Sequence, residues 1–169
     1  MTGEIIVILA GLIFVGALLD GARCDLASFR IPNRVPVVVA LAFLPAGLAA
    51  GLSGAEWLSH LGAGLIMLGI GAGLFALGVW GGGDAKLVPA VCLWLGFGSL
   101  TRFLLIMAAF GGGLALLALV ARRVPLGPEG PVRAWGRRMA DSGHVPYGLA
   151  IAAAGLDWWI PAMARHWPW

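Results

Sequence analysis

The chain contains few charged residues. Asp, Glu, Lys and Arg make up 11% of its 169 residues, whereas 60% are apolar and the mean hydropathy is +0.95. A soluble domain carries roughly 25% charged residues, so this composition excludes one and indicates a membrane protein. The two cysteines, Cys24 and Cys92, form no CxxC pair, and the three histidines, His60, His144 and His166, are scattered along the chain. Neither a disulfide framework, a metal site nor a cofactor is therefore expected.

Long uncharged runs account for most of the chain. A membrane-spanning helix needs roughly 20 apolar residues, so this length allows at most about six or seven spans. The sequence predicts an all-α integral membrane protein, a bundle of six transmembrane helices that forms a single domain over residues 1–169. The expected spans cover approximately residues 4–22, 35–53, 57–80, 86–100, 102–121 and 145–164. A cytoplasmic loop rich in Pro and Gly is expected over residues 122–144.

The basic residues are unevenly distributed over the connections between these spans. Nine of the eleven follow the first, third or fifth span, and only Arg102 and Arg165 fall on the other side. Because Lys and Arg favour the cytoplasmic side, both termini are expected on the outer side of the membrane. This topology accounts for the net charge of +3 without a nucleic-acid partner. Membrane lipids are the expected partners of the arginines in the long loop.

Small and aromatic residues suggest how the helices pack. Gly69 and Gly73 form a GxxxG pair, which predicts close contact with another helix. Most of the tryptophans near span ends are expected to be interfacial anchors; they are Trp57, Trp80, Trp158, Trp159, Trp167 and Trp169.

Each acidic residue near an apolar span needs an explanation, because ionised groups are costly in hydrocarbon. Half of the eight acids are expected in solvated positions, namely Glu4, Glu56, Glu129 and Asp141. Of the others, Asp25 and Asp84 are placed by the topology at the cytoplasmic boundary, whereas Asp157 belongs to the outer side. Asp20 lies about 140° round a helix from Asp25, so these two should not line the same pocket.

Asp25 and Asp84 lie in distinctive local sequences. Asp84 follows three glycines, Gly81 to Gly83, at a turn between two apolar runs. Such glycines allow another segment to approach the carboxylate closely, although a plain loop would tolerate them equally well. A phosphate-binding loop is disfavoured because no GxxxxGK[ST] motif follows a strand. Asp25 lies eight residues before Asn33, which ends the sequence Arg-Ile-Pro-Asn.

Together these elements resemble the type IV prepilin leader peptidase family, the prepilin peptidases of the GxGD aspartic protease class. The resemblance is closest to the short form that accompanies Tad/Flp pilus systems. The family pattern is an Asp before an R-I-P-N element, then Gly-x-Gly-Asp-x-Lys-Leu, and a V-P-Y-G-x-A-I element at the last span. The residues of this chain that match and support these motifs are Arg30, Pro32, Asn33, Gly81, Gly83, Lys86, Pro146, Tyr147 and Gly148.

The resemblance implies that Asp25 and Asp84 are a catalytic pair and that the substrate is a prepilin-like or pseudopilin-like precursor, cleaved at the cytoplasmic face. In such a pair one carboxylate takes a proton from water and one carboxylic acid gives a proton to the scissile carbonyl. Lys86 is expected to point away from Asp84 and suits a role as a headgroup anchor equally well. Long-form relatives carry paired CxxC motifs and also N-methylate the trimmed pilin with S-adenosylmethionine. This chain lacks those cysteines, so peptidase activity without methylation is expected.

Two other classes of function stay open. A small proton- or ion-coupled transporter would use intramembrane acids as relay groups, and the candidates are Asp20, Asp25, Asp84 and Asp157. A structural subunit without chemistry would tolerate Asn at every acid. Within the protease class, a preflagellin peptidase or a presenilin-like protease is an alternative, although no Pro-Ala-Leu element follows Asp84.

Overall fold

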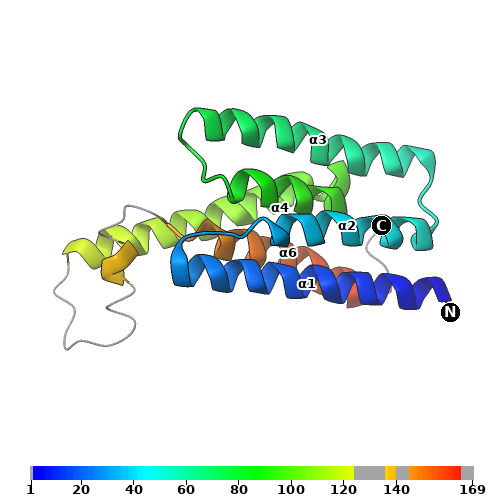
Figure 1. The fold of residues 1–169 in the computed structure, drawn as a ribbon, viewed down its shortest axis with the longest axis horizontal. Coiled ribbons are helices and arrows are strands. Elements are labelled where there is room, and N and C mark those ends of the chain that lie inside the picture. Colours follow the sequence, from blue (N-terminus) through cyan, green and yellow to red (C-terminus); the bar gives the residue numbers. More distant parts are fainter. Residues whose placement is uncertain (1, 124–135, 140–144, 165–169) are drawn as a thin grey trace.

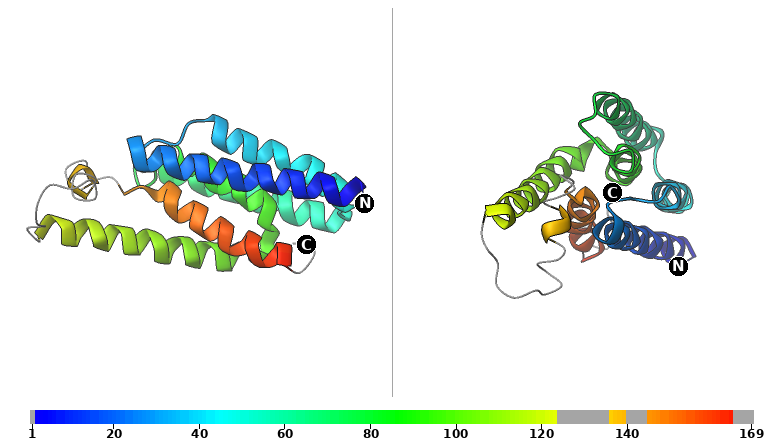
Figure 2. Two further views of the ribbon diagram at one scale, coloured as in Figure 1. Left: turned by 90° about the horizontal axis from the view of Figure 1, so that it is seen from below. Right: turned by 60° about the vertical axis from the view of Figure 1, so that its left-hand side comes forward.

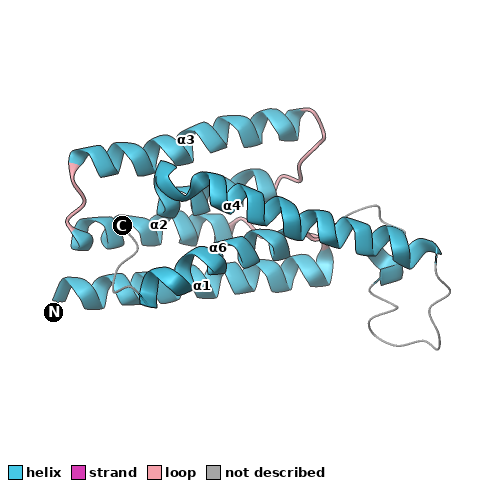
Figure 3. Cartoon of the chain, turned by 180° about the vertical axis from the view of Figure 1, so that it is seen from behind, coloured by secondary structure: helices cyan, strands magenta, loops and turns pink. Residues whose placement is uncertain are grey.

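The described part of the chain is helical. The computed structural model describes residues 2–123, 136–139 and 145–164, and in these ranges helices alternate with short turns and no strand occurs (Figures 1 and 3). The main helices are α1 (Thr2–Ser28), α2 (Arg34–Ala50), α3 (Gly54–Ala76), α4 (Asp84–Arg123) and α6 (Tyr147–Ala164). The all-α prediction is confirmed. Most of the loop expected over residues 122–144 lies outside the described residues, but α4 extends to Arg123 and residues 136–139 are helical.

The longest helix, α4, is broken at Gly96. The backbone of Gly96 has φ 59° and ψ −173°, which is not helical, and residues 84–95 and 97–123 run in opposite directions (Figures 2 and 3). The hydroxyl of Ser59 on α3 accepts a hydrogen bond of 3.1 Å from the N–H of Phe97, just after the break. The sequence placed this break at residues 100–102. The structure moves it to Gly96 because glycine adopts a positive φ without a steric penalty.

Within the residues that the structure describes, three helices are long and apolar enough to cross a membrane. They are Thr2–Ser28, Gly54–Ala76 and Asp84–Val120, and Arg34–Ala50 is a shorter apolar helix. Many leucines and isoleucines point outward from the bundle, for example Leu12, Leu58 and Leu65. This apolar outer surface indicates a membrane protein. The six-span count stays a prediction.

An aromatic cluster lies at the centre of the bundle. The ring of Phe14 on α1 lies 4.7 Å from that of Trp94 on α4 and 5.9 Å from that of Trp159 on α6, measured between centroids. The indole N–H of Trp94 donates a hydrogen bond of 2.8 Å to the carbonyl of Val39 on α2. The cluster thus joins four helices.

Two predictions about packing are wrong. Trp158 and Trp159 are buried rather than interfacial, because Gly11 on α1 leaves the space that the Trp159 ring occupies; Trp167 and Trp169 lie outside the described residues. Within the chain, Gly69 and Gly73 have nothing within 4 Å of a built Cβ. Two other glycines of α3, Gly71 and Gly64, pack closely against α4 instead. A Cβ on Gly71 would lie 2.9 Å from the Ala85 carbonyl oxygen, and a Cβ on Gly64 would lie 2.5 Å from Leu93 Cδ2.

The ends of the helices gather at two ends of the bundle. Figure 1 shows the α1–α2 connection, the α3–α4 connection and the end of α4 at one end. The beginning of α1 and the end of α6 lie at the other. We call the first the connection end; it brings together the segments on either side of Asp25 and Asp84.

Candidate active site

Asp25 and Asp84 come from different helices that meet at the connection end. Asp25 lies in the last turn of α1, and Asp84 is the first residue of α4. Ile31 packs against both Gly83, the residue before Asp84, and Gly148, whose N–H binds Asp25. The side chain of Asp25 is buried and that of Asp84 is half-buried. The structure therefore brings together the two aspartates that the sequence singled out.

The beginning of α6 holds the Asp25 carboxylate. The backbone N–H of Gly148 donates a hydrogen bond of 2.7 Å to Asp25 Oδ2. Gly148 is the second residue of α6, where backbone N–H groups have no partner within the helix. Asp25 therefore supplies an acceptor for this helix terminus and lies where the helix dipole favours negative charge.

Ile31 joins the three sequence elements. A Cβ on Gly83 would lie 2.8 Å from Ile31 Cβ, and a Cβ on Gly148 would lie 3.1 Å from Ile31 Cδ1. Ile31, which is buried, is therefore packed between the glycine turn before Asp84 and the beginning of α6. Its side chain helps to fix the positions of both backbone segments.

The glycine turn provides space around Asp84. Among the described glycines, positive φ angles occur at Gly51, Gly78 and Gly96 and not in the turn itself. A Cβ on Gly81 would lie 3.0 Å from Asp84 Oδ2, and a Cβ on Gly83 would press on Ile31. Gly81 and Gly83 are thus needed because a side chain there would press on Asp84 or Ile31, and not because the turn has an unusual backbone conformation. This agrees with the interpretation that the glycines allow close approach to Asp84 rather than with that of a plain loop.

The Arg-Ile-Pro-Asn turn is tied to α4 by a side-chain hydrogen bond. Lys86 Nζ donates to Asn33 Oδ1 at 2.9 Å, which the sequence did not indicate. The Pro32 carbonyl accepts a hydrogen bond of 3.0 Å from the N–H of Val35, at the start of α2. Arg30 is exposed and makes no hydrogen bond or ion pair with the described residues. Asn33 and Lys86 therefore connect the segments that follow Asp25 and Asp84.

The end of α1 has a strained residue next to this turn. Phe29 has φ 53°, a left-handed conformation that is uncommon for a residue other than glycine. Its N–H donates to the Asp25 carbonyl at 2.8 Å. This conformation ends the helix and turns the chain towards Ile31.

Pro146 and Tyr147 position the start of α6. Pro146 is buried and its carbonyl accepts a hydrogen bond of 3.2 Å from the Leu149 N–H. The Tyr147 ring lies against Gly111 of α4, where a Cβ would be 2.6 Å from Tyr147 Cζ. The second half of α4 therefore supports the segment that carries the Gly148 N–H.

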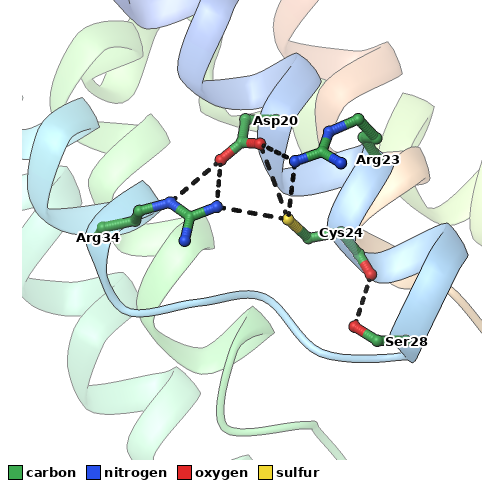
Figure 4. Close-up of polar contacts among 5 residues, drawn as sticks. All are labelled: Asp20, Arg23, Cys24, Ser28 and Arg34. Atoms are coloured by element: carbon green, nitrogen blue, oxygen red, sulfur yellow. Dashed lines mark hydrogen bonds and ion pairs between the residues drawn. The ribbon is translucent and has the colours of Figure 1, made fainter.

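Asp20 belongs to a separate cluster on the α1–α2 side (Figure 4). Its carboxylate accepts hydrogen bonds from Arg23 at 2.8 Å and from Arg34 at 2.9 Å. The Cys24 sulfur lies 3.7 Å from Arg23 and 3.6 Å from Arg34. Asp20 thus links α1 to α2 through Arg23 and Arg34, whereas the Asp25 carboxylate binds the N–H of Gly148.

Asp157 on α6 is also ion-paired. Arg102 of α4 lies 3.0 Å from Asp157 Oδ2. No group of three or more His, Cys, Asp or Glu side chains suited to a metal ion occurs within the part of the chain that the structure describes.

Several contributors to the site were not foreseen from the sequence. The Gly148 N–H, the Ile31 side chain and the left-handed Phe29 act through backbone position or packing. The motif resemblance singled out Gly148, but it did not indicate that its N–H binds Asp25.

The sequence of the chain matches a peptidase family. The sequence model of the type IV leader peptidase family matches residues 12–116, which is more than half of the chain. The chain belongs to this family. No curated protein and no solved structure matches the chain. The matched range contains both Asp25 and Asp84, whereas Gly148 lies beyond it.

Proposed function

We propose that the chain is a membrane aspartic endopeptidase that removes the N-terminal leader from type IV or Flp prepilin-like precursors. Membership of the leader peptidase family supports peptidase activity in general. The observation that carries the aspartic mechanism is the placement of Asp25 and Asp84 at the connection end. Asp25 lies in the last turn of α1 and Asp84 is the first residue of α4, and Ile31 packs between the segments that adjoin them.

The proposed reaction uses the pair as acid and base. One carboxylate takes a proton from water, and the oxygen of this water attacks the carbonyl carbon of the scissile peptide bond. The other aspartate, as a carboxylic acid, donates its proton to the carbonyl oxygen. Collapse of the tetrahedral intermediate breaks the C–N bond, and the amine leaves with a proton from the pair. Two neighbouring carboxyls share roughly one proton, which suits these complementary roles.

The position of the pair supports cleavage at one membrane boundary. Asp25 and Asp84 lie at the connection end, next to Arg23, Arg30, Arg34 and Lys86 in the sequence. We assign this end to the cytoplasmic face by the distribution of basic residues. A precursor with a polar leader before an apolar helix would present its leader at this boundary.

The cysteine content distinguishes between the long and the short form of the family. The chain has two cysteines and no CxxC pair, which supports the short Tad/Flp-type form with peptidase activity alone. The substrate class is accordingly a pilin or pseudopilin precursor that is trimmed and not methylated by this protein.

The test is co-expression of the chain with candidate precursors, followed by mass measurement of the pilin. Asp25→Asn and Asp84→Asn should each lower trimming by about 10²-fold or more, the usual contribution of acid–base catalysis. Asp157→Asn is the matched control, since its carboxylate pairs with Arg102 and should not be needed for trimming. Normal trimming by a folded, inserted Asp25→Asn or Asp84→Asn variant would refute the proposal. Proton or ion flux in liposomes that is lost in Asp20→Asn would favour a transporter.

A further inference from the structure

A groove separate from the aspartate pair lies between α2, α3 and α4. It has a volume of about 600 Å³. Its wall on α4 is formed by Lys86, Pro89, Ala90 and Leu93, which lie at i, i+3, i+4 and i+7 and so share one helix face. Seven residues of helix correspond to roughly 10 Å, which gives the approximate length of this wall.

The groove is apolar except at one end. Leucines of α3 and three residues of α2, Pro36, Val37 and Ala40, line it opposite α4. The only polar side chains in its wall are Asn33 and Lys86. Lys86 is the first and Leu93 the last of the α4 residues in this wall, so these two residues mark opposite ends of the groove along α4. At the Leu93 end, Gly64 of α3 packs against the Leu93 side chain. The polar end coincides with the connection end, where α2 and α4 begin.

The polar end can bind an anion. Lys86 is the only lysine of the chain, and its ammonium donates to Asn33 Oδ1. It makes no ion pair with a carboxylate among the described residues. A lysine ammonium has three N–H donors, so two remain for a ligand, and the Asn33 amide group adds further donors. The positive charge of Lys86 is therefore uncompensated at the mouth of an apolar groove.

We propose that this groove is a binding site for an anionic phospholipid, with one acyl chain between the three helices and the phosphate at Lys86 and Asn33. A phospholipid has the same order of features as the groove, an anionic phosphate that is linked through glycerol to narrow apolar chains. A spanning helix is about 30 Å long and 10–12 Å wide with its side chains, so it would place only a small part of its surface in this groove. The proposal rests on the membrane location of the chain and not on its peptidase activity.

The binding test uses native mass spectrometry of the purified protein in detergent, with phosphatidylglycerol or phosphatidylcholine added. The wild-type protein should retain phosphatidylglycerol in preference to phosphatidylcholine. Lys86→Gln should lower the affinity for phosphatidylglycerol about fivefold, the effect expected for one cation near a headgroup, and remove the preference. Ala40→Phe, which fills the groove, should lower retention of both lipids. Arg23→Gln, which removes a basic residue outside the groove, and Ala108→Phe, which adds a ring at an exposed site on α4, should leave retention unchanged.

A second measurement does not depend on the folding of the groove-filling variant. Val37 lines the groove and is 53% exposed, so a benzophenone amino acid should be tolerated there. In membranes containing the co-expressed precursor, it should cross-link to phospholipid. Cross-linking to the apolar segment of the precursor instead would overturn the proposal in favour of a polypeptide site. Unchanged lipid selectivity in Lys86→Gln would overturn it as well.

Discussion

The backbone N–H of Gly148 donates a 2.7 Å hydrogen bond to Oδ2 of Asp25, a residue 123 positions earlier in the chain. This contact connects the first helix to the start of the last one. It also fixes one oxygen of the carboxylate, so that the other oxygen is left to act on water in the proposed mechanism. The position of α6 thus bears directly on the geometry of the aspartate pair.

We expect Gly148→Ala to lower leader cleavage. The added methyl group would lie 3.0 Å from both Cβ and Oδ2 of Asp25 and 3.1 Å from Ile31, so the carboxyl group must shift by a few tenths of an ångström. The loss in rate should therefore stay below the roughly 100-fold that a displacement of about 1 Å can cost. The initial rate of precursor cleavage by purified protein measures the effect. Gly112→Ala is the control, because nothing lies within 4 Å of its built Cβ; a rate for Gly148→Ala equal to that of the control would contradict this interpretation.

We expect Lys86 and Asn33 to be energetically coupled. Their hydrogen bond of 2.9 Å joins the Arg-Ile-Pro-Asn turn to α4, but both side chains are exposed. A double-mutant cycle of Lys86→Met and Asn33→Ala should therefore give a modest coupling free energy, about 0.5–1 kcal/mol. The measurement is reversible unfolding in detergent. A cycle of Lys86→Met with Asp157→Asn should be additive, and additivity in the Lys86–Asn33 cycle would show that the contact contributes nothing to stability.

Much of the architecture follows from simple features of the sequence. Apolar runs predict the helices, and the alternation of connections places Asp25 and Asp84 at one end of the bundle. Whether their carboxyl groups approach each other depends on packing between α1, α4 and α6, which hydropathy does not specify. The Gly148 hydrogen bond cannot be predicted from the sequence for a similar reason. Every residue other than proline has a backbone N–H, and only the position of Gly148 in the folded chain makes its N–H a partner for Asp25.

The wrong predictions about tryptophan position and glycine packing have a common cause, since the same sequence feature is found in two structural environments. Tryptophan near a span end serves equally as an interfacial anchor or as part of the core, and burial of Trp159 depends on Gly11 of another helix. In α3, the pair Gly69 and Gly73 has the same spacing as a packing motif, yet α4 lies on the face that contains Gly64 and Gly71. The expected spans 86–100 and 102–121 place the break in α4 next to the charged Arg102, whereas the non-helical backbone lies at Gly96.

The two faces of α3 should respond differently to added methyl groups. Gly71→Ala would place a Cβ 2.9 Å from the backbone oxygen of Ala85, which cannot move aside as a flexible side chain can. We expect a loss of about 1–3 kcal/mol in the free energy of unfolding, as for other overpacked sites. Because Ala85 follows Asp84, cleavage should also fall. Gly73→Ala, on the open face, should leave both stability and cleavage close to wild type, and equal behaviour of the two variants would contradict the packing described above.

The reversal of the chain within α4 should depend on Gly96. With φ 59° and ψ −173°, Gly96 has a backbone conformation that is almost exclusive to glycine, and an L residue held in it costs roughly 1–3 kcal/mol. A Cβ would also lie 3.1 Å from Ser59 Oγ and 3.2 Å from His60 Cε1, so Gly96→Ala should lower the unfolding free energy by at least about 1 kcal/mol. Gly98→Ala has open space and no positive φ and serves as the control two residues away. Thermal unfolding in detergent compares them; a Gly96→Ala variant as stable as Gly98→Ala would mean that the break does not require glycine, and the two parts of α4 would then be held apart by packing alone.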